Sequence, residues 1–239
     1  MIIILLYSTT EDHKQNDLNL EEGKPTLFSF WLSSCSWRVR IVLNLKKLDY
    51  NYVASLFNYK NDAFFKLNPT KLVPALYVDG HFITESIAIC QYLDETRPGP
   101  VGLMPKDLYQ RALVRQVCEQ INAGIQPMQN LKLINKLGDD YNADKVAWCN
   151  YWNVQGLAAL DKILARTAGK YSVGDELTIA DAFLVPQAWA AFIRFNIDRS
   201  TIPNIARVYD TLIEIPEIKD AAPDKQPDYD PEQMKSLVK

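Results

Sequence analysis

The sequence predicts a protein in two parts, a small α/β unit followed by a unit built only of helices. Up to Thr96, short β-branched and aromatic runs alternate with short amphipathic segments. The stretch 97–102, which reads Arg-Pro-Gly-Pro-Val-Gly, interrupts any helix and is typical of a linker. Beyond it, apolar residues recur at helical spacing as far as Glu217. A chain of 239 residues has room for both units.

In the first part we expect strands and helices in the order βαβ and then ββα, which gives a small α/β domain. Asp79-Gly80 separates the last two strands and is a strong signal for a hairpin turn. The expected strands are 26–31, 52–56, 75–78 and 81–83, and the expected helices are 36–48, 62–67 and 86–95.

In the second part the expected helices are 108–137, 143–167, 179–191 and 202–213, with a last turn near Glu217. Gly124 and Pro127 are expected to bend the first of these helices. Thr178 and Asp181 have the spacing of a capping box, in which each side chain binds the backbone of the other residue. The residues from Pro223 onward are rich in Pro, Asp and Lys, so we expect a loosely attached tail.

Composition excludes several classes of function. The net charge of −3 argues against nucleic acid or an anionic membrane as partner, and no apolar run approaches the roughly 18 residues of a membrane-spanning helix. The apolar run at the start lacks a basic flank and is short for a signal peptide, so residues 1–23 are interpreted as a largely disordered extension of unexplained role.

The cysteines and histidines limit which compartment, metal sites and catalytic bases are plausible. The four cysteines lie far apart and form no CxxC motif, which favours a reducing compartment such as the cytoplasm. Two histidines in the whole chain argue against both a zinc site and a histidine base, and we expect no metal. Neither GxGxxG nor a P-loop is present.

The segment 33–41, which reads Ser-Ser-Cys-Ser-Trp-Arg-Val-Arg-Ile, is the most informative part of the chain. It lies between an expected strand and an expected helix, so hydroxyl and thiol groups gather where a helix begins. The free N–H groups and the positive dipole end of that helix favour an anion. Taken alone, this is a weak signal.

Two further motifs give it weight. Residues 68–76 (NPTKLVPAL) resemble the NPxxxVPxL segment of cytosolic glutathione transferases, with Pro74 in the place of the cis-proline of that family. A cis bond before Pro74 would turn the Val73 backbone so that its N–H and C=O pair with an extended peptide ligand. Residues 84–89 resemble the segment that holds the γ-glutamyl end of glutathione. The resemblance implies a thioredoxin-like domain followed by the helical domain of a glutathione transferase.

Within that superfamily the chain is similar to the zeta class, the maleylacetoacetate isomerases. The similarity runs in order from about residue 24 to 230 and implies a thioredoxin-like domain over 24–104, a helical domain over 105–231, a tail over 232–239 and a homodimer. Between Tyr52 and Asn68 the chain is several residues shorter than the family usually is, so no ligand contact is assigned there. The motifs are 33–40 (SSCSWRVR), 124–131 (GIQPMQNL), 171–176 (YSVGDE), 180–187 (ADAFLVPQ) and 226–228 (QPD).

The chemistry of the family begins with the glutathione thiolate. The pKa of a free thiol is ~8.5. Lowering this pKa by ~2 units, so that the thiolate forms at neutral pH, requires roughly 2.7 kcal/mol. A helix N-terminus supplies ~0.3–2 kcal/mol and one hydrogen bond to a charged group ~1.5–3 kcal/mol, so a hydroxyl donor at a helix start suffices. By position this donor is Ser33, with Ser34 and Cys35 in the same turn. An ordinary N-cap is the alternative for either serine, and an inert small side chain is the alternative for Cys35.

The resemblance assigns the remaining site residues. Glu85 would bind the ammonium group of the γ-glutamyl moiety, and Ser86 would bind its carboxylate or simply cap the following helix. Gln126 and Asn130 would share one helix face near glutathione, with a solvated polar face as the alternative. Arg194 would neutralise a carboxylate of the substrate, or else be a surface arginine.

The favoured function is therefore the glutathione-dependent isomerisation of maleylacetoacetate to fumarylacetoacetate in tyrosine and phenylalanine breakdown, with general glutathione transferase activity. The thiolate would add to the cis double bond, the single bond would rotate, and elimination would release the trans product. Three alternatives remain: dehalogenation of small α-haloacids, a thiol transferase that uses Cys35 as nucleophile, and a glutathione-fold binding protein without turnover.

Overall fold

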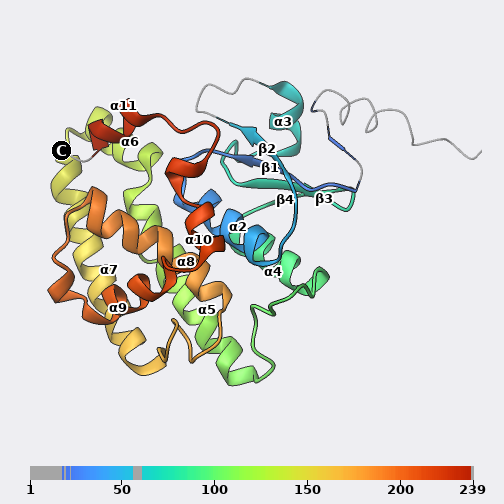
Figure 1. Ribbon diagram of the computed structural model, residues 1–239. Coiled ribbons are helices and arrows are strands. Elements are labelled where there is room, and N and C mark those ends of the chain that lie inside the picture. The colour runs from blue at the N-terminus through green and yellow to red at the C-terminus, as the bar shows by residue number, and fades with distance from the viewer. Residues whose placement is uncertain (1–17, 19, 22, 56–60, 238–239) are drawn as a thin grey trace, which may run out of the picture.

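The computed structural model describes residues 18, 20, 21, 23–55 and 61–237. Most of the predicted extension, and Leu56 at the end of the second expected strand, lie outside these residues. The described part has a small sheet with flanking helices followed by a larger helical half, with the C-terminal segment returning to the first half (Figure 1). This arrangement confirms the predicted fold class.

The sheet has four strands in the order β2-β1-β3-β4. β1 is parallel to β2 and antiparallel to β3, and β3 forms a hairpin with β4. The first strand ends before Phe30 rather than at Trp31, so the aromatic residues after it belong to the loop that leads into the first helix. The strands are β1 (Thr26–Ser29), β2 (Asn51–Ala54), β3 (Ala75–Val78) and β4 (His81–Thr84).

Helices cover the two faces of the sheet. α2 (Ser34–Leu45) and α4 (Ser86–Thr96) pack together with Leu27 and Leu76 on the face toward the helical half. α3 (Asp62–Leu67) covers the opposite face, where Phe28 and Phe64 meet. Adjacent residues of β1 thus serve opposite faces, as the pleat of a strand requires.

The helical half surrounds α8, which is buried along almost its whole length and contacts α2, α5 and α9. Its capping box is formed as predicted by Thr178 and Asp181. No helix in the described part of the chain is both long enough and apolar enough to cross a membrane. The helical elements of this half are α5 (Leu108–Asn122), η1 (Gln126–Gln129), α6 (Leu131–Tyr141), α7 (Lys145–Thr167), α8 (Ile179–Trp189), the π-helical turn η2 (Ala190–Arg194), η3 (Arg199–Thr201), α9 (Pro203–Leu212), α10 (Pro216–Asp220), η4 (Pro223–Lys225) and α11 (Pro231–Leu237).

The predicted long helix 108–137 is wrong, because the chain breaks where only a bend was expected. α5 ends at Asn122, a 3₁₀ turn follows, and α6 starts after Asn130. Pro127 has no N–H to donate to a continuing helix, and the Asn130 side chain accepts a hydrogen bond from the Lys132 N–H and caps a new one.

The C-terminal segment is not loosely attached, contrary to expectation. The Asp228 carboxylate accepts hydrogen bonds from the Trp31 N–H and from the Tyr52 hydroxyl, and the Tyr229 ring meets the Trp31 ring edge-on at 5.0 Å between centroids. Gln226 is buried. Its amide donates to two backbone carbonyls in the turn before it. Abundant proline and aspartate therefore signal an irregular backbone here, and contacts with Trp31 and Tyr52 of the first half hold that backbone in place.

Candidate active site

Three predicted site segments meet at one edge of the sheet. Phe28 pairs with Ala75, and Ala75 pairs with Thr84, so the three residues form a row across β1, β3 and β4. β1 leaves this row toward Ser33, β3 enters it from Val73, and β4 leaves it toward Glu85. The strand register thus brings together three segments, which we call the hydroxyl turn (33–36), the proline segment (68–76) and the γ-glutamyl segment (84–89).

The hydroxyl turn is the N-terminus of α2. Ser33 is the N-cap, and its Oγ accepts a hydrogen bond from the Ser36 N–H at 3.2 Å. Ser33, Ser34 and Cys35 are half-buried. A hydroxyl that accepts from the backbone still has its own proton to donate, so the capping role leaves Ser33 free to donate to an anion placed at the helix end.

The proline segment presents a backbone suited to a peptide ligand. The Val73–Pro74 bond is cis, as predicted, and Val73 is half-buried. Within the described part of the chain, the Val73 N–H and C=O form no hydrogen bond. An extended peptide needs such a free pair of groups, so this segment fits the backbone of glutathione.

The γ-glutamyl segment forms the start of α4. Glu85 is exposed and occupies the cap position with a positive φ of 68°, and its side chain makes no capping hydrogen bond. The first N–H groups of α4 therefore lack a side-chain acceptor, which suits a carboxylate ligand. Ser86 does not cap the helix, contrary to one alternative. Its buried Oγ accepts instead from the Arg38 Nη1 at 3.1 Å.

The structure does not place Gln126 and Asn130 on one helix face, so that geometric prediction is wrong. Gln126 belongs to the 3₁₀ turn η1, and Asn130 caps α6. The η1 turn nevertheless contacts α8, because the Gln129 side chain donates to the Gln187 side chain at 3.1 Å. Gln126 therefore lies on a turn that is tied to the central helix, and Asn130 directly follows that turn.

Arg194 ends the π-helical turn that follows α8. The end of α8 lies beside the start of α2, because the Trp189 ring meets the Trp37 ring at 5.6 Å. The guanidinium lies 5.2 Å from the centre of the Phe195 ring, and burial lowers its pKa. Within the described part of the chain it forms no ion pair, so it is a partly buried cation available to a carboxylate.

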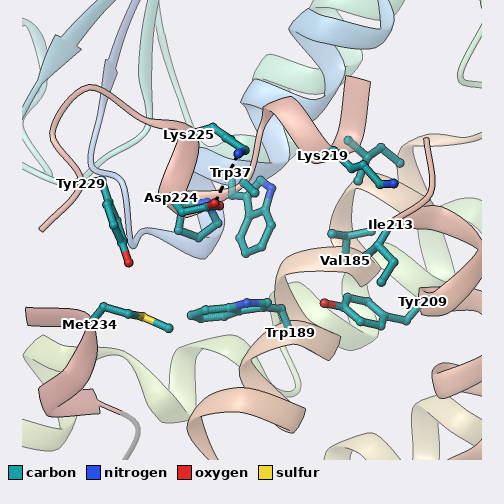
Figure 2. Close-up of a pocket in the computed structure, with 13 residues that line it drawn as sticks. Trp37, Val185, Trp189, Tyr209, Ile213, Lys219, Asp224, Lys225, Tyr229 and Met234 are labelled. Atoms are coloured by element: carbon teal, nitrogen blue, oxygen red, sulfur yellow. Dashed lines mark ion pairs between the residues drawn. The ribbon is translucent and has the colours of Figure 1, made fainter. Parts of the chain in front are cut away.

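A cavity of about 390 Å³ opens next to these helices. Figure 2 shows Trp37, Trp189 and Met234 facing it from α2, α8 and α11, and the Lys225–Asp224 ion pair at its border. None of the predicted site residues is among those that line it. Aromatic and aliphatic side chains form most of its lining.

Known proteins share both halves of this arrangement. The family model of the glutathione S-transferase N-terminal domain matches residues 32–96, and the model of the C-terminal domain matches residues 152–221. The maleylacetoacetate isomerase of Dictyostelium discoideum is 43% identical over 222 residues, which span 89% of this chain and 100% of that protein. The chain belongs to the maleylacetoacetate isomerase family of glutathione transferases.

Solved structures of this family agree. The crystal structure of the maleylacetoacetate isomerase from Anaeromyxobacter dehalogenans 2CP-1, with glutathione bound in its active site, is 37% identical with a TM-score of 0.78 and covers 87% of this chain and 98% of that one. The structure of a bacterial maleyl pyruvate isomerase, a zeta-class glutathione transferase, is also 37% identical, with a TM-score of 0.80, and covers 86% of this chain and 100% of that one. The resemblance to the zeta class is therefore confirmed.

Sequence reasoning did not assign a role to the two buried arginines of the isomerase motif in α2. Arg38 donates to Ser86 and, at 2.8 Å, to Asn122 of α5, and its guanidinium lies 4.2 Å from the centre of the Phe183 ring. Arg40 donates to backbone carbonyls around the β1–α2 loop. In the sequence, Arg38 and Arg40 alternate with apolar residues of an expected helix. This pattern could have indicated that both arginines are buried, and buried arginines require partners.

Proposed function

We propose that this protein is a glutathione-dependent cis–trans isomerase that converts maleylacetoacetate to fumarylacetoacetate in tyrosine and phenylalanine breakdown, with general glutathione transferase activity. The observation that carries the proposal is the meeting of Ser33, Val73 and Ser86 at one sheet edge. Together these segments offer a hydroxyl donor, a free peptide backbone and an uncapped helix start.

Bound glutathione supplies a thiolate that adds reversibly to the cis double bond, which permits rotation. Ser33 donates its hydroxyl proton as a hydrogen bond to that sulfur and, with the N-terminus of α2, lowers the pKa of the thiol. Ser34 and Cys35 border the same position. Val73 pairs with the peptide backbone, while Glu85 holds the ammonium group and Ser86 the carboxylate of the γ-glutamyl end.

The helical half completes the site. Gln126 on the η1 turn and Asn130, which follows it, contribute near glutathione, and Arg194 binds a carboxylate of the diketo acid. A partly buried guanidinium without an ion-pair partner in the described chain supports this role, because a dianionic substrate supplies the missing charge.

We also propose a cytoplasmic homodimer. All four cysteines are free thiols, which fits a reducing compartment. α5 and α7 expose large apolar side chains, among them Leu108 at 81%, Tyr109 at 69% and Tyr151 at 60% exposure, and such residues are typical of a covered interface. Sedimentation should give the mass of two chains, and Tyr151→Glu should shift the equilibrium toward one chain.

The activity of Ser33→Ala tests the proposed chemistry. With maleylacetone as substrate, the wild type should turn over only with glutathione, and the variant should lose about 10- to 100-fold in kcat/KM, because it lacks a hydrogen bond worth ~1.5–3 kcal/mol to a charged sulfur. Ser33→Thr should retain most of the activity.

A matched control separates capping from catalysis. Asp107→Ala removes a similar N-cap, since its side chain accepts from the Gln110 N–H at 2.8 Å at the start of α5. It should lower stability as much as Ser33→Ala and leave turnover unchanged. Full activity of Ser33→Ala would refute the assignment of Ser33, and absence of turnover in the wild type would refute the proposed reaction.

A further inference from the structure

Residues of the C-terminal segment bind the loop between β1 and α2. The Asp228 Oδ2 accepts a hydrogen bond from the Trp31 N–H at 3.1 Å, and its Oδ1 accepts one from the Tyr52 hydroxyl at 2.7 Å. Tyr229 and Met234 pack against the aromatic residues of the same loop. Figure 2 shows both side chains on the side of the cavity away from Tyr209. The loop thus contacts residues almost 200 positions later in the sequence.

Arg40 donates hydrogen bonds to the carbonyl groups of the same loop. This fully buried side chain donates from Nη1 to the Phe30 carbonyl at 3.3 Å and from Nη2 to the Trp31 carbonyl at 3.1 Å. Its Nε donates to the Ala221 carbonyl at 3.0 Å, just before the C-terminal segment. Asp228 therefore holds the Trp31 N–H while Arg40 holds the carbonyls on either side.

Charge supports the same arrangement. Burial lowers the pKa of Arg40 to about 10, and the negative charge of Asp228 acts in the opposite direction. Burial raises the pKa of Tyr52, so its phenol remains a proton donor to the carboxylate at neutral pH. The Asp228 carboxyl group therefore faces a phenol donor and lies near a buried guanidinium.

The loop that Asp228 and Arg40 bind leads directly to Ser33, the proposed hydroxyl donor. The Ser33 N–H donates to the Phe30 carbonyl at 3.0 Å, so the backbone of Ser33 is bonded to the same carbonyl group that Arg40 holds. The position of the Ser33 Oγ therefore depends on the loop that Asp228 fixes two residues earlier. A misplacement of about 1 Å at a reacting group costs on the order of a hundredfold in rate.

We propose that Asp228 is a positioning residue, which sets the place of the Ser33 hydroxyl through the backbone of Trp31 and so tunes the glutathione thiol. The role rests on the proposed function, because it acts through Ser33 and does not touch glutathione. It gives the Gln-Pro-Asp motif at 226–228 a role in the reaction.

The test measures the pKa of the enzyme-bound glutathione thiol from the pH dependence of the ultraviolet absorbance of the thiolate. Asp228→Asn keeps the shape but loses one acceptor and the charge, so the thiol pKa should rise by about one unit and kcat/KM should fall about tenfold at neutral pH. KM for glutathione should change less than about twofold, because no contact to the peptide is lost. In a Ser33→Ala background, Asp228→Asn should raise the pKa no further.

Asp161→Asn is the matched control for a purely structural effect. Like the half-buried Asp228, the buried Asp161 carboxylate accepts from backbone N–H groups, those of Asn204 and Ile205 at the start of α9. It should lower the melting temperature comparably and leave the thiol pKa unchanged. A pKa as low in Asp228→Asn as in the wild type would overturn the proposal, as would a further rise in the Ser33→Ala background.

Two more measurements separate the possible failures. If Ser33→Ala itself leaves the thiol pKa unchanged, the proposed activator is wrong, and the positioning role is refuted with it. If Ser33→Ala raises the pKa and Asp228→Asn does not, the positioning role alone is wrong. Should Asp228→Asn not fold, Tyr52→Phe removes one donor to the carboxylate and leaves the Trp31 contact. It should raise the thiol pKa by a smaller amount, and an unchanged pKa would overturn the proposal.

Discussion

Replacing Asp181 by alanine should destabilise the protein severely without touching the active site. The carboxylate accepts hydrogen bonds from the Thr178 N–H at 2.8 Å, the Thr178 hydroxyl at 3.2 Å and the Ser172 N–H at 2.8 Å. All three residues are buried, so the substitution leaves two backbone donors without acceptors, at a cost of ~1–3 kcal/mol each. Burial raises the pKa of Asp181, because a carboxylate is costly to take out of water, and its removal recovers part of that cost. We expect a net loss of about 3 kcal/mol.

Urea unfolding at neutral pH, followed by circular dichroism, measures this loss. Because a native protein is stable by ~5–15 kcal/mol, the variant should unfold at a clearly lower urea concentration while the slope of the transition stays the same. Asp198→Ala is the control, since Asp198 caps the exposed η3 turn by accepting from the Ser200 N–H at 2.9 Å, and should cost less than about 1 kcal/mol. A loss below about 1 kcal/mol for Asp181→Ala would refute the reasoning from buried donors.

Two other substitutions test one buried ion pair and one more exposed ion pair. Lys46 Nζ lies 2.6 Å from the Asp94 carboxylate with both side chains buried, so Lys46→Met should cost about 3–5 kcal/mol in thermal or urea unfolding, and adding Asp94→Leu should recover part of the loss; additive losses would contradict this. The hydrogen bond from Arg97 lowers the pKa of the more exposed Asp79 to about 2. The unfolded chain thus binds more protons between about pH 4 and 2, so the stabilisation is present above that range and is lost as the pH falls through it. Asp79→Asn should therefore cost less than about 1 kcal/mol at neutral pH, and the difference from the wild type should vanish near pH 2; a difference that persists there would exclude the pair as its cause.

Local signals predicted most of the elements of the fold. The hairpin at Asp79-Gly80, the start of α3 at Asp62 and the capping box at Thr178 all appear where the sequence places them, because each depends on contacts within a few residues. The break after α5 was underestimated, since a proline within a helical pattern permits either a kink or a stop. The hydrogen bonds that the next turn finds decide between these outcomes.

The attachment of the C-terminal segment could not be predicted, because its partners are distant in sequence. Nothing near Asp228 in the chain indicates that its acceptor atoms face Trp31 and Tyr52. For the site, motif similarity located the segments around Ser33 and Ser86, and strand register explains why they converge. The catalytic and binding roles of the predicted residues stay predictions.

The contacts of Arg38 have a consequence for how such a protein can be recombined. This one guanidinium serves the γ-glutamyl segment through Ser86, the first helix of the other half through Asn122, and the central helix through the Phe183 ring. A chimaera joined at the linker would therefore need both an acceptor at the end of α5 and an aromatic ring in α8 from its new partner. Without them, the exchange would leave the buried Arg38 guanidinium with Ser86 as its remaining hydrogen-bond partner. The two halves differ in architecture, but they are not interchangeable parts.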